Sequence, residues 1–412
     1  MKAAGGTRRL ATQSTADICR GIHLHTTPKS LKKRQCQLPS EHRFLRSFHS
    51  TATISARDDP STSSTSQAFD RSLKILQRNN AARATLRYRN EGEASDFKTT
   101  KTRDYYDYFR DEIATRLIDR LDDIKHEGGF GLALDVGSGA GHVYKAICAD
   151  DALDGSGGIG GVRKLVQVDA ADELLNRDAN AQFAGQERCE TYRLALDPQP
   201  QTEAKLPFPD GTFDLVTSCA SFHWINDLPG LLREIHRVLK PDGCFLWAMV
   251  GGTTLPELRV ALVLAEQERA GGVSPHVGPF CELQDVGSLL QSFGFALPTL
   301  DTDTVRLSFP HAGVLMEHVR RMGEGNASLR RRTHTGLDTF LATACLYDQM
   351  FPENTAAGDA EQAIEATVQV IYAIGWKPHE SQQKPLQHGT ATHRISEAVQ
   401  HTKSDDGGLS SS

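Results

Sequence analysis

The chain has 412 residues, a formal net charge of −6 and 39% hydrophobic residues. This length is enough for one large α/β domain with additions, and no stretch approaches the roughly 20 uninterrupted apolar residues that a membrane span requires. Residues 1–48 carry a net charge of +8, which leaves −14 for the remainder. Because so acidic a body repels a phosphate backbone, we expect no nucleic-acid substrate.

Residues 1–66 are rich in Arg, Lys, Ser and Thr and poor in acids. This composition is typical of a mitochondrial transit peptide, and Arg46-Ser47-Phe48 resembles a matrix-processing site. We therefore predict a transit peptide and disordered linker over residues 1–66 and a location in the mitochondrial matrix. A merely disordered tail is the alternative that the same composition allows.

An N-terminal helical segment is predicted for residues 67–129. Apolar residues repeat every four positions from Tyr105 to Leu121, and Asp104 is placed to cap that helix. Strand and helix patterns then alternate through residues 130–253, which predicts a parallel sheet with right-handed crossovers. Its strands are expected at 132–136, 165–168, 191–196, 213–218 and 244–250, and its helices at 142–149, 171–176 and 228–239.

The rest of the chain, residues 254–391, is predicted to be a helical addition with final strands. Helical patterns occupy 254–269, 285–292, 314–321 and 339–350, and strand patterns occupy 296–300, 305–309 and 368–374. A Lys-Pro-Asp-Gly turn is expected at 240–243, just before the fifth strand of the preceding unit. Residues 392–412 have the composition of a disordered tail.

A glycine-rich turn follows the strand at 132–136. It places Gly137, Gly139 and Gly141 at alternate positions after Asp135. Glycines let a ligand approach the backbone closely, and the N–H groups of the next helix face that ligand. The dinucleotide fingerprint needs glycine where His142 stands, and the P-loop lysine is absent. An acid here opposes a pyrophosphate but suits a zwitterion with an ammonium and a sulfonium, so we predict S-adenosylmethionine. A purely structural turn is the alternative.

Four more residues follow predicted strands, where α/β sheets bind their ligands. Asp169 is placed to accept the ribose hydroxyls, or else to cap the next helix. Asp197 is placed to accept the adenine amino group, or else to be a solvated loop acid. His223 and Trp224 are candidate pocket and catalytic residues, with His223 as a general base; simple packing is the alternative.

The eight cysteines form no C-x-x-C pair and no metal-ligand spacing, so we interpret them as reduced thiols. A non-haem iron site needs two histidines and a carboxylate. His223, His276 and His379 with Glu380 are the candidates, but they lack the spacing of such a site. We predict no metal.

Several segments carry a resemblance to known families. Residues 206–224 and 233–243 resemble class I methyltransferases of the biotin-synthesis type. Residues 69–71, 77–82, 223–229, 271–276 and 374–382 resemble more narrowly the family of mitochondrial complex I assembly factors described as arginine hydroxylases. The resemblance implies a class I methyltransferase Rossmann-like α/β fold: a mostly parallel seven-stranded sheet with helices on both faces and a helical addition.

The same resemblance implies S-adenosylmethionine as cofactor and, as partner, a protein substrate: a quinone-site subunit of complex I, hydroxylated on an arginine at the matrix face of the inner membrane. Two departures affect the site. Ser138 stands where the family usually has cysteine, and inserts at 151–161 and 198–204 enlarge loops near the pocket. Two alternatives remain: a small-molecule carboxyl O-methyltransferase of the biotin-synthesis type and a non-catalytic assembly chaperone.

Overall fold

The computed structural model describes residues 24–25, 67–93, 106–124, 128–149, 158–199, 202–352 and 363–382. Almost all of the predicted transit peptide, the cap at Asp104 and the predicted tail at 392–412 lie outside these described residues. Within them, no helix is both long and apolar enough to cross a membrane.

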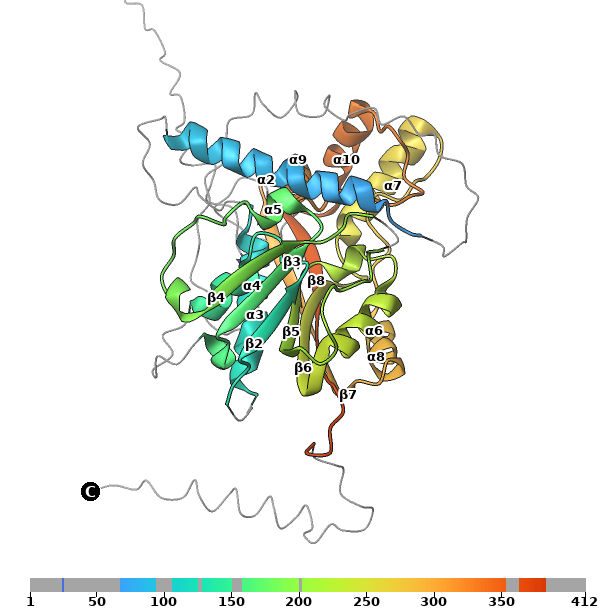
Figure 1. Cartoon of the computed structure of the whole chain (residues 1–412). Coiled ribbons are helices and arrows are strands. Elements are labelled where there is room, and N and C mark those ends of the chain that lie inside the picture. The colour runs from blue at the N-terminus through green and yellow to red at the C-terminus, as the bar shows by residue number, and fades with distance from the viewer. Residues whose placement is uncertain are drawn as a thin grey trace, which may run out of the picture.

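A single sheet runs through the molecule in the order β1-β7-β8-β6-β5-β2-β3-β4 (Figure 1). Five of its strands are parallel: β2 (Leu132–Val136), β3 (Lys164–Asp169), β4 (Glu190–Ala195), β5 (Phe213–Cys219) and β6 (Leu239–Val250). β8 (Ile364–Trp376) pairs antiparallel with β6 and β7 (Ala296–Phe309), and the two residues of β1 (Leu24–His25) pair with β7. The predicted mostly parallel seven-stranded sheet is confirmed, with β1 as an additional short edge.

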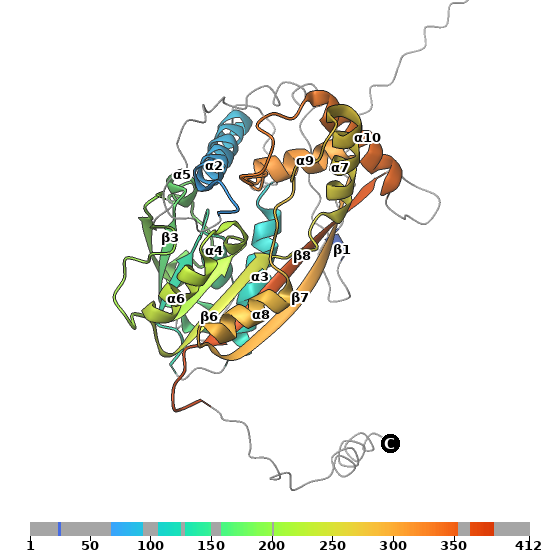
Figure 2. The same cartoon turned by 90° about the vertical axis from the view of Figure 1, so that its right-hand side faces the viewer.

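Helices cover both faces of this sheet (Figures 1 and 2). Alternate strand residues point to opposite faces: Ala133 joins the apolar cluster of α3 and α4, and Leu134 joins that of α6 and α8. The helices are α2 (Arg71–Glu93), α3 (Tyr108–Asp122), α4 (His142–Cys148), α5 (Asp172–Leu175), α6 (Leu228–Val238), α7 (Pro256–Ala270), α8 (Leu283–Ser292), α9 (Ala312–Arg321) and α10 (Leu337–Met350), with short 3₁₀ turns η3 (Ile159–Gly161), η4 (Gln186–Arg188) and η6 (Phe222–Trp224).

Two details of the sequence prediction were wrong. The strands expected at 296–300 and 305–309 are one strand, β7, which pairs with β8 along nearly its whole length. The acids between them break the apolar pattern but face α3, where Asp301 and Asp303 form ion pairs with Arg120 and Arg116. The turn at 240–243 is an irregular stretch inside β6, since strand pairing jumps there and Asp242 has a φ of 65°.

The first long helix, α2, lies across the carboxyl edge of the parallel strands (Figure 1). Arg78 on this helix contacts Asp169, the last residue of β3, and Ser221, which follows β5. A small apolar group supports the helix from below, with Ala82 packed near Ala140 and Leu174. α2 therefore closes the edge at which ligands of such sheets bind.

A buried ionic triad connects the start of α3 to the segment after α5. The guanidinium of Arg177 donates two hydrogen bonds to Asp107, at 3.1 and 2.6 Å, and two to Asp178, at 3.1 and 2.8 Å. Burial opposes the ionised form of each acid, but the pKa values of Asp107 and Asp178 are lowered because Arg177 and Lys145 stabilise the carboxylates. The triad positions α3 beneath the glycine-rich loop.

We expect Asp107→Asn to lower the free energy of unfolding by about 1–3 kcal/mol at pH 7, because it removes one of the two carboxylates that bind the buried Arg177, while Asp178 keeps its own two hydrogen bonds. Since the pKa of Asp107 is lowered in the folded protein, its carboxylate stabilises the fold at pH values above the ordinary pKa of aspartate. This stabilisation is lost as the pH falls towards the folded-state pKa. Urea unfolding at pH 7 and pH 3 measures both effects. A destabilisation that is equal at the two pH values would contradict this role.

Candidate cofactor and substrate site

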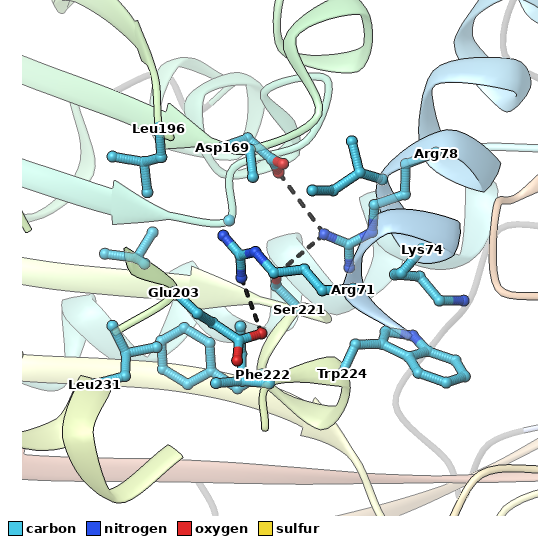
Figure 3. A pocket seen from close by; sticks show the side chains of 15 residues that line it. Arg71, Lys74, Arg78, Asp169, Leu196, Glu203, Ser221, Phe222, Trp224 and Leu231 are labelled. Atoms are coloured by element: carbon cyan, nitrogen blue, oxygen red, sulfur yellow. Dashed lines mark hydrogen bonds and ion pairs between the residues drawn. The ribbon is translucent and has the colours of Figure 1, made fainter. Parts of the chain in front are cut away.

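A pocket opens between α2 and the carboxyl ends of β2, β3, β4 and β5 (Figure 3). The strand order reverses between β2 and β5, and ligands of open α/β sheets bind at such a reversal. About 610 Å³ of empty space lies in the pocket and at its open mouth. Its lining is Arg71, Lys74, Ile75, Arg78, Val136, Gly137, Asp169, Ala170, Leu196, Glu203, Ser221, Phe222, Trp224, Ile225 and Leu231.

The glycine-rich turn after β2 reaches this pocket through Gly137, whereas Gly139 and Gly141 are not in its lining. Gly137 has a φ of 72°, and a Cβ placed on it would lie 2.1 Å from Ser221 Oγ. Gly141, the left-handed N-cap of α4, approaches the side chain of Gln167 in the same way. Only glycine combines these backbone angles with so close an approach. Gly139 lies between them and donates its N–H to the Asp169 carboxylate at 3.0 Å.

Asp135 is fully buried near the end of β2, just before this turn. One carboxylate oxygen accepts a hydrogen bond from Thr217 Oγ1 at 3.3 Å, and Oδ2 has no hydrogen-bond partner among the described residues. Burial raises the pKa of Asp135 to about 8. Because an unsatisfied buried oxygen is costly, Asp135 is poised to receive a donor or a positive charge from a ligand.

Asp169 stands in the pocket at the end of β3. Its oxygens accept the N–H groups of Gly139 and Ala171, and its Oδ2 lies 3.8 Å from Arg78 Nη1. The N-cap of α5 is Ala171, so Asp169 stands ahead of the helix and is not its capping residue. Arg78 is itself buried, and its Nε has no partner within the described chain. A carboxylate and a guanidinium are thus both presented to a ligand (Figure 3).

The structure does not bring Asp197 into the pocket lining. Asp197 accepts the N–H of Gln199 at 3.1 Å in an exposed loop, as a turn residue does. The neighbouring Leu196 lines the pocket instead. On the opposite wall, the buried Glu203 forms an ion pair with Arg71 of α2 at 2.8 Å.

His223 and Trp224 lie in η6, after β5, and only Trp224 lines the pocket. Both donate to Glu324, which also pairs with Arg110. Burial lowers the pKa of His223, so the ring is neutral. Its Nε2–H donates to Glu324, and its Nδ1 has no partner within the described chain. Burial opposes the charge of Glu324, but Arg110, His223 and Lys74 hold its pKa well below the usual range.

Sequence reasoning missed the charged residues that α2 contributes. Arg71, Lys74 and Arg78 all line the pocket, and they lie three or four positions apart, which places them on one helix face. Their spacing was the available signal. Glu324 gave no local signal, because it follows α9, about a hundred residues after the histidine that it binds.

No group of three or more His, Cys, Asp or Glu side chains that could hold a metal ion occurs in the described parts of the chain. The iron-ligand candidates lie in separate places. His276 contacts Glu266, His223 contacts Glu324, and His379 contacts Ser381 at the surface.

Comparison with known proteins agrees with this geometry. The family described as methyltransferase domain matches residues 134–247. A mitochondrial arginine-hydroxylase NDUFAF5 of Rattus norvegicus is 40% identical over 324 residues, 79% of this chain and 81% of that protein. Its Homo sapiens counterpart is 38% identical over 83% of this chain and 86% of that protein. A malonyl-[acyl-carrier protein] O-methyltransferase of Laribacter hongkongensis is 26% identical over 68% of this chain and 86% of that protein.

The fold and the glycine-rich pocket define an enzyme of the class I S-adenosylmethionine-dependent methyltransferase superfamily. Within that superfamily, the chain belongs to the mitochondrial arginine-hydroxylase NDUFAF5 family. Both levels of the sequence resemblance are therefore confirmed. The relatives' names support a mitochondrial location for this chain, and the methyltransferase domain supports a cofactor of the S-adenosylmethionine type.

We expect Gly137→Ala to weaken S-adenosylmethionine binding by at least about tenfold, because the new Cβ would collide with Ser221 at a left-handed backbone position. Gly211→Ala is the matched control: Gly211 has a φ of 60°, but a Cβ added there would meet nothing within 4 Å. Calorimetric titration of the full chain measures both affinities. Equal affinities would show that the turn does not contact the cofactor.

We expect Asp135→Asn to stabilise the cofactor-free protein by a margin that grows as the pH rises towards 8, the folded-state pKa. A carboxyl with a raised pKa supports folding while protonated and loses that contribution as the pH rises through the folded-state value. The limiting slope is about 1.4 kcal/mol per pH unit. Urea unfolding of both proteins across this range measures the margin; a margin independent of pH would contradict the buried, unpaired carboxyl.

Proposed function

We propose that this protein is an S-adenosylmethionine-binding arginine hydroxylase that modifies an arginine of a respiratory complex I subunit during assembly. The supporting observation is its similarity to the arginine-hydroxylases, which covers about four fifths of both chains and extends well beyond the methyltransferase domain. We further propose that it acts in the mitochondrial matrix, peripheral to the inner membrane, on a quinone-site subunit.

The pocket residues fit the proposed cofactor. Asp169 offers a carboxylate in the pocket lining for ribose hydroxyls. Asp135 is fully buried beside the lining residue Val136 and is not itself part of the lining, and its unsatisfied oxygen is our candidate partner for an ammonium. Arg78 supplies a cation suited to the carboxylate of the methionine moiety. Gly137 lines the pocket and lets Ser221 approach its backbone closely. When bound, this cofactor supplies an electrophilic sulfonium methyl group.

A cationic arginine side chain suits the charge of the protein. Outside residues 1–48 the chain carries −14, and acidic surfaces attract cationic partners and disfavour nucleic acids. Glu203 in the pocket lining and Glu324, which binds the lining residue Trp224, are carboxylates that already bind arginine side chains of the protein itself. Guanidinium–carboxylate pairs are the strong, bidentate class of ionic hydrogen bond.

The proposed reaction and its methyl-transfer alternative leave different masses on the substrate. Hydroxylation replaces a C–H hydrogen with a hydroxyl group, adds one oxygen atom and consumes an external oxidant. Methyl transfer adds one methylene group and leaves the demethylated cofactor. His223 is neutral and its Nδ1 has no partner among the described residues, but it lies outside the pocket lining, so we assign it the role of orienting Glu324 in either case.

The test is peptide mass spectrometry of the quinone-site subunit from cells that lack this protein and express either the wild type, Gly137→Ala or Gly211→Ala. We expect an arginine carrying one additional oxygen atom with the wild type and with Gly211→Ala, and its loss with Gly137→Ala. Added methylene in place of oxygen would overturn hydroxylation in favour of methyl transfer. If complex I still assembles with Gly137→Ala, and the mass of the subunit is the same in all strains, the protein acts as an assembly chaperone.

A further inference from the structure

A cage for a cation lies at the end of the pocket opposite Asp169. Lys74 Nζ stands 3.4 Å from the centroid of the Trp224 ring, within the range of a strong cation–π contact. It also donates to the backbone carbonyls on either side of Glu324, at 3.2 and 2.6 Å. Phe69 and Phe280 pack edge-on against Trp224, with centroids 5.1 and 5.6 Å away.

Glu324 strengthens this cage for a positive charge. Trp224 Nε1 donates to its carboxylate, which draws negative charge towards the indole and makes the ring face more attractive to a cation. The carboxylate is 21% exposed on its side chain and stays ionised because Arg110 and His223 bind it. An aromatic face, two carbonyls and a carboxylate together match an ammonium or a guanidinium.

The cage opens into the cofactor pocket. Lys74 and Trp224 both line the space that Asp169 and Gly137 line at the other end. Figure 3 shows the Lys74 ammonium beside the Trp224 indole, on the same side of the pocket as Arg78. A side chain held on Trp224 would therefore lie in the same cavity as a cofactor held by Asp169.

Lys74 belongs to a helix that is attached mainly through ionic contacts. Four ion pairs attach the helix and the residue before it to the rest of the protein. They are Asp70–Arg331, Arg71–Glu203, Arg83–Glu173 and Arg89–Asp178. Its apolar support is limited to small groups around Ile75 and Ala82 near the middle and Phe69 with Leu73 at the start. The pairs of Arg83 and Asp70 are partly exposed and contribute little stability each, whereas those of Arg71 and Arg89 are largely buried. Lys74 is itself buried and donates to two carbonyls, so only a cation that replaces these contacts can displace it.

We propose that Trp224 and Glu324 form the seat for the guanidinium of the substrate arginine, and that Lys74 occupies this seat until the substrate displaces it. This inference rests on the proposed arginine substrate. The guanidinium stacks on the Trp224 face and donates to Glu324 and the neighbouring carbonyls. Burial lowers the pKa of Lys74 well below its ordinary value, whereas a guanidinium stays charged, so the exchange favours an arginine over the lysine.

The experiment measures binding of the peptide acetyl-Gly-Arg-Gly-amide to the full chain saturated with S-adenosylhomocysteine. The same peptide with citrulline, the neutral isostere of arginine, is the ligand control. Lys74→Met vacates the seat, and we expect it to raise the affinity for the arginine peptide by roughly threefold or more. Trp224→Leu removes the aromatic face and should lower that affinity by about tenfold. Neither variant should change the binding of the citrulline peptide.

Arg83→Met is the matched control variant. It removes another cation of α2, which pairs with Glu173 outside the pocket lining, and so loosens the helix without vacating the seat. Arg83→Met should bind the arginine peptide as the wild type does, and Lys74→Arg should do the same because it refills the seat. Urea unfolding and S-adenosylhomocysteine affinity of Lys74→Met, both expected to match the wild type, separate a vacated seat from a damaged fold.

The outcomes separate this proposal from the proposed function. Equal peptide affinities for Lys74→Met, Arg83→Met and the wild type would overturn the seat, even if the substrate arginine still gains oxygen in cells. Equal binding of the citrulline and arginine peptides would also overturn it. The expected pattern of affinities without any arginine modification in cells would support the seat and contradict the hydroxylase.

Discussion

The attachment of α2 across the carboxyl edge of the sheet is the contact on which the site depends. Without Arg71 and Arg78, the turn after β2 and the end of β3 would form an open ledge instead of a pocket. The attachment is ionic: Glu203 and Asp169, which contact these arginines, are largely buried. Buried charges must be paired, so any ligand that takes one of these carboxylates must supply a replacement charge or release an arginine.

The parallel strands and the glycine-rich turn were predictable because they depend on short-range patterns. The buried run that forms β2 and the turn at Gly137 sit next to each other in the sequence, and each has one sterically allowed arrangement. β7 was less predictable. In the sequence, Asp301 and Asp303 have the pattern of loop residues. In the structure they pair with Arg120 and Arg116 of α3, which lie almost two hundred positions earlier.

The same distinction separates the parts of the site. Asp135 and Asp169 are predictable because they lie at the ends of strands that converge on one edge. Asp197 has the same apparent placement, but Pro198 follows it and its carboxylate turns to the N–H of Gln199. Lys74 and Glu324 meet only when α2 and the segment after α9 fold together. Their pairing is a property of the tertiary structure, so no local pattern predicts it.

One helix therefore connects the two ends of the pocket. Arg78 contacts Asp169 at the cofactor end and Lys74 covers Trp224 at the other, and these residues are one turn apart on α2. Both side chains project from the same helix, so both contacts depend on where α2 lies on the sheet. A change that moved α2 off the carboxyl edge would therefore disturb the cofactor end and the opposite end of the pocket together.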